Sequence, residues 1–205
     1  SHVPVSTTFP LRMGQKPELG QAPGMAFPTN EIANADRILG LLKPFAHVAT
    51  LHGHDHENCR HYVEDIEVMT TAAVAGNWWR NGLDSRCQWG REPQGYRLVE
   101  VAADGSIVSR YIAYLPEQDE PAEAFRDAKS GRAFVNVYDA SPQTKIEVED
   151  VGPIDAIDPQ DPSSAGLATH LYELPEGFDN KRLPLRIKYE DGRVEDLVVN
   201  ISSVP

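Results

Sequence analysis

A histidine cluster, His52-Gly53-His54-Asp55-His56, follows a short buried-strand pattern and constrains this chain more than any other feature. Residues i and i+2 of an extended strand point to the same side, about 6.5 Å apart along the chain. His54 and His56 can therefore face one cleft, and such a pair suits two metal ions about 3.5 to 4 Å apart. The cluster predicts a dinuclear metal site. The competing interpretation is an exposed histidine-rich turn that binds metal only adventitiously.

A further histidine stands near the first residue of the chain, in Ser1-His2-Val3-Pro4, where the proline favours an extended backbone. Together, this His-x-Pro and the later Gly-His-x-His resemble the last two ligand blocks of the calcineurin-like metallophosphoesterases. The resemblance implies His2, His54 and His56 as metal ligands, with His2 and His54 on one ion and His56 on the other. It also implies two divalent or trivalent transition metal ions (manganese, iron or zinc) and direct attack of an activated water on phosphorus. No catalytic residue is assigned beyond these ligands.

The sequence also departs from that family. The family's binuclear centre needs an Asp-x-His, a Gly-Asp and a Gly-Asn-His, all of which precede the two blocks found here, and none of them is present. Gly76-Asn77 is followed by Trp78 and comes after the histidine blocks, so it does not fill that role. We therefore expect the chain to be the carboxy-terminal portion of such an enzyme, with little or no activity alone.

Local patterns divide the chain into three parts, with an overall α/β fold class. Apolar residues at helical spacing predict a helix over residues 29–42, and Ala103-Asp104-Gly105 predicts the turn of a β-hairpin. The resemblance implies a partial layered α/β metallophosphoesterase sandwich for residues 1–115. Residues 116–130, rich in proline and acidic residues, are predicted to be a linker. Short alternating segments predict a small all-β sandwich over residues 131–205.

Charge limits the possible partners. The chain has a formal net charge of −12, and residues 115–205 hold 9 basic against 19 acidic residues, a difference of −10. An acidic domain repels phosphate backbones, so nucleic acid is not expected as a partner. A phosphoester small molecule or a cell-surface substrate fits better. No run approaches the roughly 20 apolar residues of a membrane span. The oligomeric state and the phosphoester substrate, monoester or diester, stay open.

Asn77, Trp78 and Trp79 are weak candidates for substrate binding. Adjacent residues on a strand point to opposite faces, so one indole can pack in a core while the other lines the mouth of the site. Equally, both indoles can simply cover a domain junction. Cys59 and Cys87 are the only cysteines, and two cysteines decide neither a disulfide nor a metal site. The resemblance alone favours a periplasmic or extracellular location.

Two other interpretations of function stay open beside the phosphoesterase. In one, the chain is a non-catalytic metal-binding module that holds a single, weakly bound ion. In the other, the β domain of residues 131–205 is the functional part, a glycan-binding or protein-binding module for which the rest is scaffold. His52 is not expected to be a ligand, because a third imidazole on that face would crowd the ions; we expect it either to support a ligand from behind or to be buried and hydrogen-bonded.

Overall fold

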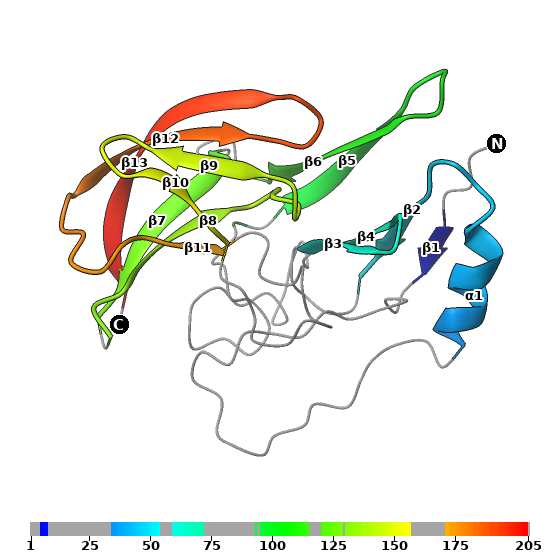
Figure 1. Cartoon of the computed structure of the whole chain (residues 1–205), viewed down its shortest axis with the longest axis horizontal. Coiled ribbons are helices and arrows are strands. Elements are labelled where there is room, and N and C mark those ends of the chain that lie inside the picture. The colour runs from blue at the N-terminus through cyan, green and yellow to red at the C-terminus, as the bar shows by residue number, and fades with distance from the viewer. Residues whose placement is uncertain are drawn as a thin grey trace, which may run out of the picture.

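The computed structural model describes residues 5–7, 34–53, 59–71, 93, 95–114, 120–128, 130–156 and 171–204 (Figure 1). These ranges form a four-stranded sheet, a two-stranded hairpin and a seven-stranded sheet. They contain one helix, α1 (Ala35–Leu42), which at eight residues is far too short to cross a membrane.

The expected α/β sandwich is wrong. Within the described ranges, thirteen strands stand against the single helix α1, and the largest unit is a seven-stranded sheet that curls into a nearly closed barrel. Residues 131–205 accordingly do not form two packed sheets. The α/β expectation came from the family resemblance. The helix that the sequence pattern predicts covers only one face of the four-stranded sheet.

The four-stranded sheet contains three parallel strands, β1 (Val5–Thr7), β2 (Ala49–His52) and β4 (Ile66–Thr70), followed at the edge by antiparallel β3 (Cys59–Val63). Helix α1 packs on one face, where Ala35, Leu39 and Leu42 join Val48 and Ile66 in one apolar cluster. The predicted helical repeat thus ends at Leu42 as expected, one residue before Lys43-Pro44.

The weak alternation of residues 62–69 predicts a single strand, but these residues form the end of β3 and most of β4. Glu64 and Asp65 make a tight turn between β3 and β4, and Glu64 adopts a left-handed backbone with φ of 55°. Glycine and asparagine are the usual residues for such a turn, so the sequence carries no clear signal for it. The consequence is that β4 lies between β2 and β3.

The hairpin β5 (Gly95–Val101) and β6 (Ile107–Ala113) confirms the turn predicted at residues 103–105, with Gly105 at φ of 87°. Its far end extends away from the barrel in Figure 1. At its base, the Tyr111 hydroxyl donates to the Pro93 carbonyl oxygen at 2.6 Å. Ser109 Oγ also lies 3.1 Å from Met69 Sδ of β4, so the hairpin packs on the face of the small sheet that α1 leaves free.

The barrel follows the order β10 (Gly152–Ile154), β9 (Lys145–Val148), β12 (Arg182–Lys188), β13 (Val194–Val204), β7 (Ala122–Asp127), β8 (Ala133–Val137) and β11 (Leu171–Glu173). An isolated bridge between Ala156 and Tyr172 links the two outer strands and nearly closes it. Strand β7 lies within the range predicted as a linker, so that range contributes a strand to the barrel.

Apolar side chains at every second position of the strands fill the barrel interior. On β12, Leu183, Leu185 and Ile187 are each at most 3% exposed, while Arg186 between them faces solvent. Strands of period two place one side chain in the core and the next outside, and several such strands around a closed sheet bury a common core. Residues 131–205 thus supply most of the hydrophobic core of the barrel, and Ala122 and Ala124 of β7 complete it.

Gly95 provides a test of the packing at the hairpin base. A Cβ built on Gly95 would lie 2.4 Å from the Ile112 carbonyl oxygen and 2.7 Å from the Tyr111 ring, so Gly95→Ala must displace backbone. We expect the variant to lose about 1–3 kcal/mol of the free energy of unfolding, as overpacking does. Urea unfolding followed by circular dichroism measures this.

Gly40 is the matched control, because a Cβ there meets nothing within 4 Å and the residue lies in helix α1. Gly40→Ala should raise the free energy of unfolding by up to about 1 kcal/mol, since alanine is the better helix former. Equal effects of the two substitutions would show that the close packing of Gly95 against Ile112 and Tyr111 does not limit the size of the residue at this position.

Candidate functional site

The carboxyl ends of the parallel strands form one edge of the small sheet. Thr7 of β1 is in register with His52 of β2, and His52 is in register with Thr70 of β4. The backbone N–H of Thr71 donates to the His52 carbonyl oxygen at 3.0 Å, which ties the ends of β2 and β4 together. Ligands of open sheets with parallel strands bind at such carboxyl ends. We take this edge as the candidate site and call it the carboxyl edge.

The predicted ligands His54 and His56 lie outside the described residues, but the two ends of their segment are placed. His52 and Cys59 both pair with Thr70, one on each side of β4. Two strand spacings separate them, about 10 Å. The six residues 53–58 join these two points and could extend much farther. The histidine segment therefore leaves and rejoins the sheet at the carboxyl edge, on either side of β4.

Asn77, Trp78 and Trp79 also lie outside the described residues. Their segment begins after Thr71, which follows β4 directly, and ends before Gly95 at the start of β5. It thus departs from the carboxyl edge between the two attachment points of residues 53–58. The topology brings the starts of both candidate segments together, which sequence spacing alone did not predict.

His2 has a different attachment. It lies outside the described residues, three positions before Val5, the first residue of β1. Because β1 and β2 are parallel, residues before β1 enter the sheet at the edge opposite to the one from which His54 departs. Three residues reach about 10 Å, so His2 meets the carboxyl edge only if the chain before Val5 turns back along β1.

The strand ends at the carboxyl edge are buried. His52 is 5% exposed, as predicted, and Thr50 and Thr70 are at most 3% exposed. Thr50 Oγ1 donates to the Glu67 carbonyl oxygen at 3.1 Å. The pattern His47-Val48-Ala49-Thr50-Leu51 predicts a strand from residue 47, but His47 is exposed and β2 begins at Ala49. Within the described ranges, no group of three or more His, Cys, Asp or Glu side chains could hold a metal ion.

A buried charge cluster joins the small sheet, the hairpin and the barrel. The Asp139 carboxylate, which follows β8, forms ion pairs with Arg97 of β5 at 2.6 Å and with Arg193 of the β12–β13 turn at 3.2 Å. The side chains of Arg97 and Asp139 are only 3% and 7% exposed. Arg60 of β3 lies 3.8 Å from the same carboxylate and donates to the Asp139 backbone carbonyl oxygen at 3.2 Å. We call this group the Asp139 cluster.

Carboxylates around the cluster balance its arginines. Glu67 Oε1 accepts from Arg60 Nε and Nη2 at 2.8 and 2.6 Å, and Asp191 accepts from Arg193 at 2.6 Å. Burial lowers the pKa of Arg60, but the charges of Glu67 and Asp139 outweigh burial and hold the pKa above its ordinary value. Arg60 therefore stays charged in the interior.

Two tyrosines border the cluster. Tyr62 of β3 donates its hydroxyl to Glu190 of the barrel, and burial together with this hydrogen bond raises the pKa of Tyr62. The Arg193 guanidinium stacks 4.3 Å from the centre of the Tyr189 ring. A cavity of about 260 Å³ opens beside Tyr189 between β6 and the barrel, lined in part by Asp139 and Arg193.

Sequence reasoning missed the Asp139 cluster. Its members lie far apart in the sequence, and no motif or spacing connects an arginine in a strand with an aspartate some 40 to 80 positions later. The one local signal is an arginine in an otherwise apolar strand pattern, as in Tyr96-Arg97-Leu98. Such an arginine is read more readily as a solvated residue.

Comparison of the chain with protein-family models, with curated proteins and with solved structures finds no match.

Substitution of Asp139 tests the cluster. Asp139→Asn keeps the shape but removes the charge that faces Arg60, Arg97 and Arg193 in the interior. Removing one partner of a buried ion pair typically costs about 3–5 kcal/mol, and we expect a loss of this size in urea unfolding. Asp196→Asn, which breaks the exposed pair with Arg186, is the control and should change stability little. Comparable losses in the two variants would contradict the role of burial.

Alkaline pH tests the buried phenols. Burial raises the pKa of Tyr172 and of Tyr189. In the unfolded chain tyrosine releases its proton near pH 10, so above this pH the unfolded state binds fewer protons than the folded state. The free energy of unfolding should therefore be unaffected by these groups below about pH 10 and should fall as the pH rises above it. Urea midpoints between neutral and alkaline pH measure the slope.

Tyr172→Phe should reduce that alkaline slope, because Tyr172 is 2% exposed and loses only its hydroxyl. Tyr96→Phe is the matched control for loss of a phenol, since the Tyr96 side chain is 47% exposed. An identical slope in the Tyr172→Phe variant and the unsubstituted protein would mean that the Tyr172 phenol ionises within the fold.

Proposed function

We propose that this chain is the carboxy-terminal portion of a binuclear-metal phosphoesterase and contributes histidine ligands to metal-dependent hydrolysis of phosphoesters. The observation that carries the proposal is the carboxyl edge, where the segment holding His54 and His56 is attached on both sides of β4. A short segment tied at both ends holds its side chains near one place. His54 and His56 thus have a common origin at a sheet edge typical of binding sites.

The donor set fits a transition metal. Imidazole nitrogens suit manganese, iron and zinc. Two such ions, when bound, supply an activated water and neutralise charge on the phosphoryl oxygens. In this proposal, His54 and His56 are metal ligands from one segment. His2 is a third ligand, from the chain before β1.

The acidic second half of the chain favours small substrates over polyanions. Residues 115–205 have an excess of ten acidic residues, 19 against 9. The resulting negative field repels long phosphate backbones, whereas a single phosphoester carries far less charge. A small-molecule or surface-linked phosphoester is therefore the proposed substrate class, with metals in the site offsetting the local repulsion.

Metal binding tests the proposal on the chain as it stands. Cobalt(II) titration, followed by its visible absorption, should show binding that is weakened at least about tenfold in His54→Ala and in His56→Ala. His2→Ala is measured separately, because it reports whether the chain before β1 turns back to the carboxyl edge. His47→Ala is the matched control, since His47 is exposed and precedes β2, and it should bind cobalt unchanged.

Catalysis is the second readout of the same variants. With the upstream ligand blocks restored, the protein should hydrolyse an aryl phosphate in the presence of manganese, and His54→Ala or His56→Ala should abolish the activity. Cobalt binding that none of the histidine variants affects would contradict the proposal. A single weakly held ion without hydrolysis by the extended protein would instead identify a non-catalytic metal-binding module.

A further inference from the structure

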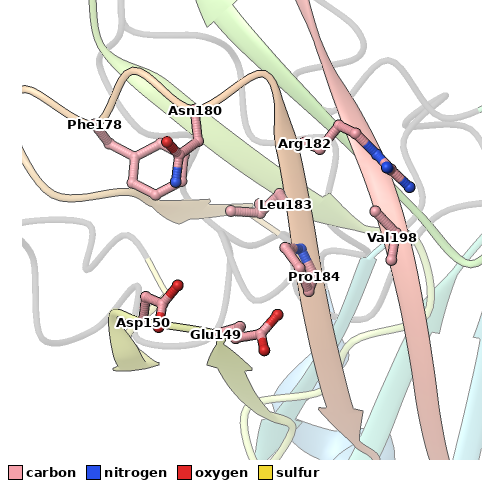
Figure 2. Close-up of a pocket in the computed structure, with 8 residues that line it drawn as sticks. All are labelled: Glu149, Asp150, Phe178, Asn180, Arg182, Leu183, Pro184 and Val198. Carbon is pink, nitrogen blue, oxygen red and sulfur yellow. The ribbon is translucent and has the colours of Figure 1, made fainter.

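A groove on the barrel wall, which we call the barrel groove, opens between the turn that joins β9 to β10 and the residues 178–180 (Figure 2). Figure 2 shows Leu183 and Pro184 of β12 between these two walls. The groove encloses about 310 Å³, a volume at the lower end of the range for small-molecule sites. It belongs entirely to the barrel and makes no use of His54 or His56, so it is independent of the proposed phosphoesterase.

Both walls of the barrel groove are fixed by hydrogen bonds. The backbone N–H of Glu149 donates to the Pro184 carbonyl oxygen at 3.1 Å, which ties the turn to the floor. On the other side, the Phe178 N–H donates to the Pro175 carbonyl oxygen at 3.1 Å, and Arg126 donates to the Phe178 carbonyl oxygen. A ligand therefore meets a preformed site and does not have to order it on binding.

The polar side chains of the groove are uncommitted. Within the described part of the chain, Glu149, Asp150 and Asn180 make no side-chain hydrogen bond or ion pair. Other charged residues on the same barrel wall are paired, as in the 2.7 Å contact between Lys188 and Glu147. Carboxylate oxygens accept hydrogen bonds, and an amide both accepts and donates them, so the groove offers several free partners to a ligand.

Apolar surface accompanies these polar groups. The Phe178 ring is half-buried beside Asn180, Pro184 is half-buried and Leu183 is fully buried. A site with an apolar floor and polar groups around it suits a ligand that is itself apolar on one face and hydroxylated around its rim. A sugar ring has this character, because its C–H groups can pack on an aromatic ring or proline while its hydroxyls donate to carboxylates.

The geometry points to a binding site for a neutral sugar ring in the barrel groove. Ring hydroxyls donate to Glu149 and Asp150 and exchange hydrogen bonds with Asn180, while the C–H face packs against Phe178 and Pro184. An anionic ligand is disfavoured, because two carboxylates and only one guanidinium, that of Arg182, line the groove, and residues 115–205 carry an excess of ten acidic residues, 19 against 9. A simple amine would satisfy the carboxylates but would leave the Asn180 amide and the apolar surface without a partner.

Nuclear magnetic resonance of the ¹⁵N-labelled chain provides the test. The probes are the methyl glycosides of glucose, galactose, mannose and N-acetylglucosamine, each titrated separately into the millimolar range. At least one of them should shift the backbone amides of Glu149, Asp150 and Asn180 with a millimolar dissociation constant. Spermidine is titrated in parallel at low and at high salt to detect binding by charge alone.

Two variants and a control locate the binding. Glu149→Gln removes the charge of one acceptor and should weaken binding of the active glycoside about tenfold, whereas Asn180→Ala removes a neutral hydrogen-bond partner and should weaken it by about twofold to tenfold. Glu176→Gln is the matched control, because Glu176 is an exposed carboxylate near Phe178 that does not line the groove. Circular dichroism confirms that each variant is folded.

Several results would overturn the inference. These are the absence of amide shifts with every glycoside, shifts confined to other parts of the barrel, and equal weakening by Glu176→Gln. Spermidine binding at the groove that disappears at high salt, with no glycoside binding, would identify a site for cations instead. None of these results bears on the histidine variants, so failure here leaves the phosphoesterase proposal to its own test.

Discussion

The buried carboxylate of Asp139 is the constraint on which the arrangement of the three sheets depends. It contacts arginines from the small sheet, the hairpin and the barrel. An arginine without a counter-ion is very costly in the interior, so none of the three units can separate without exposing or isolating a charge. Four carboxylates offset the three guanidiniums in these ion pairs, which involve Arg60, Arg97, Arg193, Glu67, Asp139, Asp191 and Glu195.

Local signals in the sequence predicted local structure and little beyond it. The hairpin around Gly105 and the end of α1 at Leu42 follow from turn chemistry and helical periodicity within a few residues. The Glu64-Asp65 turn lacks such chemistry, so two strands were read as one. The barrel depends on pairings such as Ala124 with Ile201, and strand periodicity says which face of a strand is buried but not which strand lies beside it. The α/β expectation came instead from the family resemblance, and the barrel contradicts it.

The candidate site was predictable to a similar degree. The alternation of His54 and His56 is a property of one segment and can be read from the sequence. Their relation to His2 depends on the register of β1 and β2, which are parallel with Val5 opposite Thr50. This register puts the attachment of His2 at the other edge of the sheet, a fact that no motif contains. The two histidine blocks are consecutive in the family's sequence pattern. Only the strand pairing shows at which edge of the sheet each block is attached.

The Asp139 cluster and the carboxyl edge are connected through β3. Residues 53–58 rejoin the sheet at Cys59, and the next residue, Arg60, is held by Glu67 and by Asp139 of the barrel. One end of the histidine segment is therefore fixed by the pairing of β2, and the other by a buried ion pair. The barrel thus stabilises the strand at which residues 53–58 return to the sheet, through the contacts of Asp139 with Arg60.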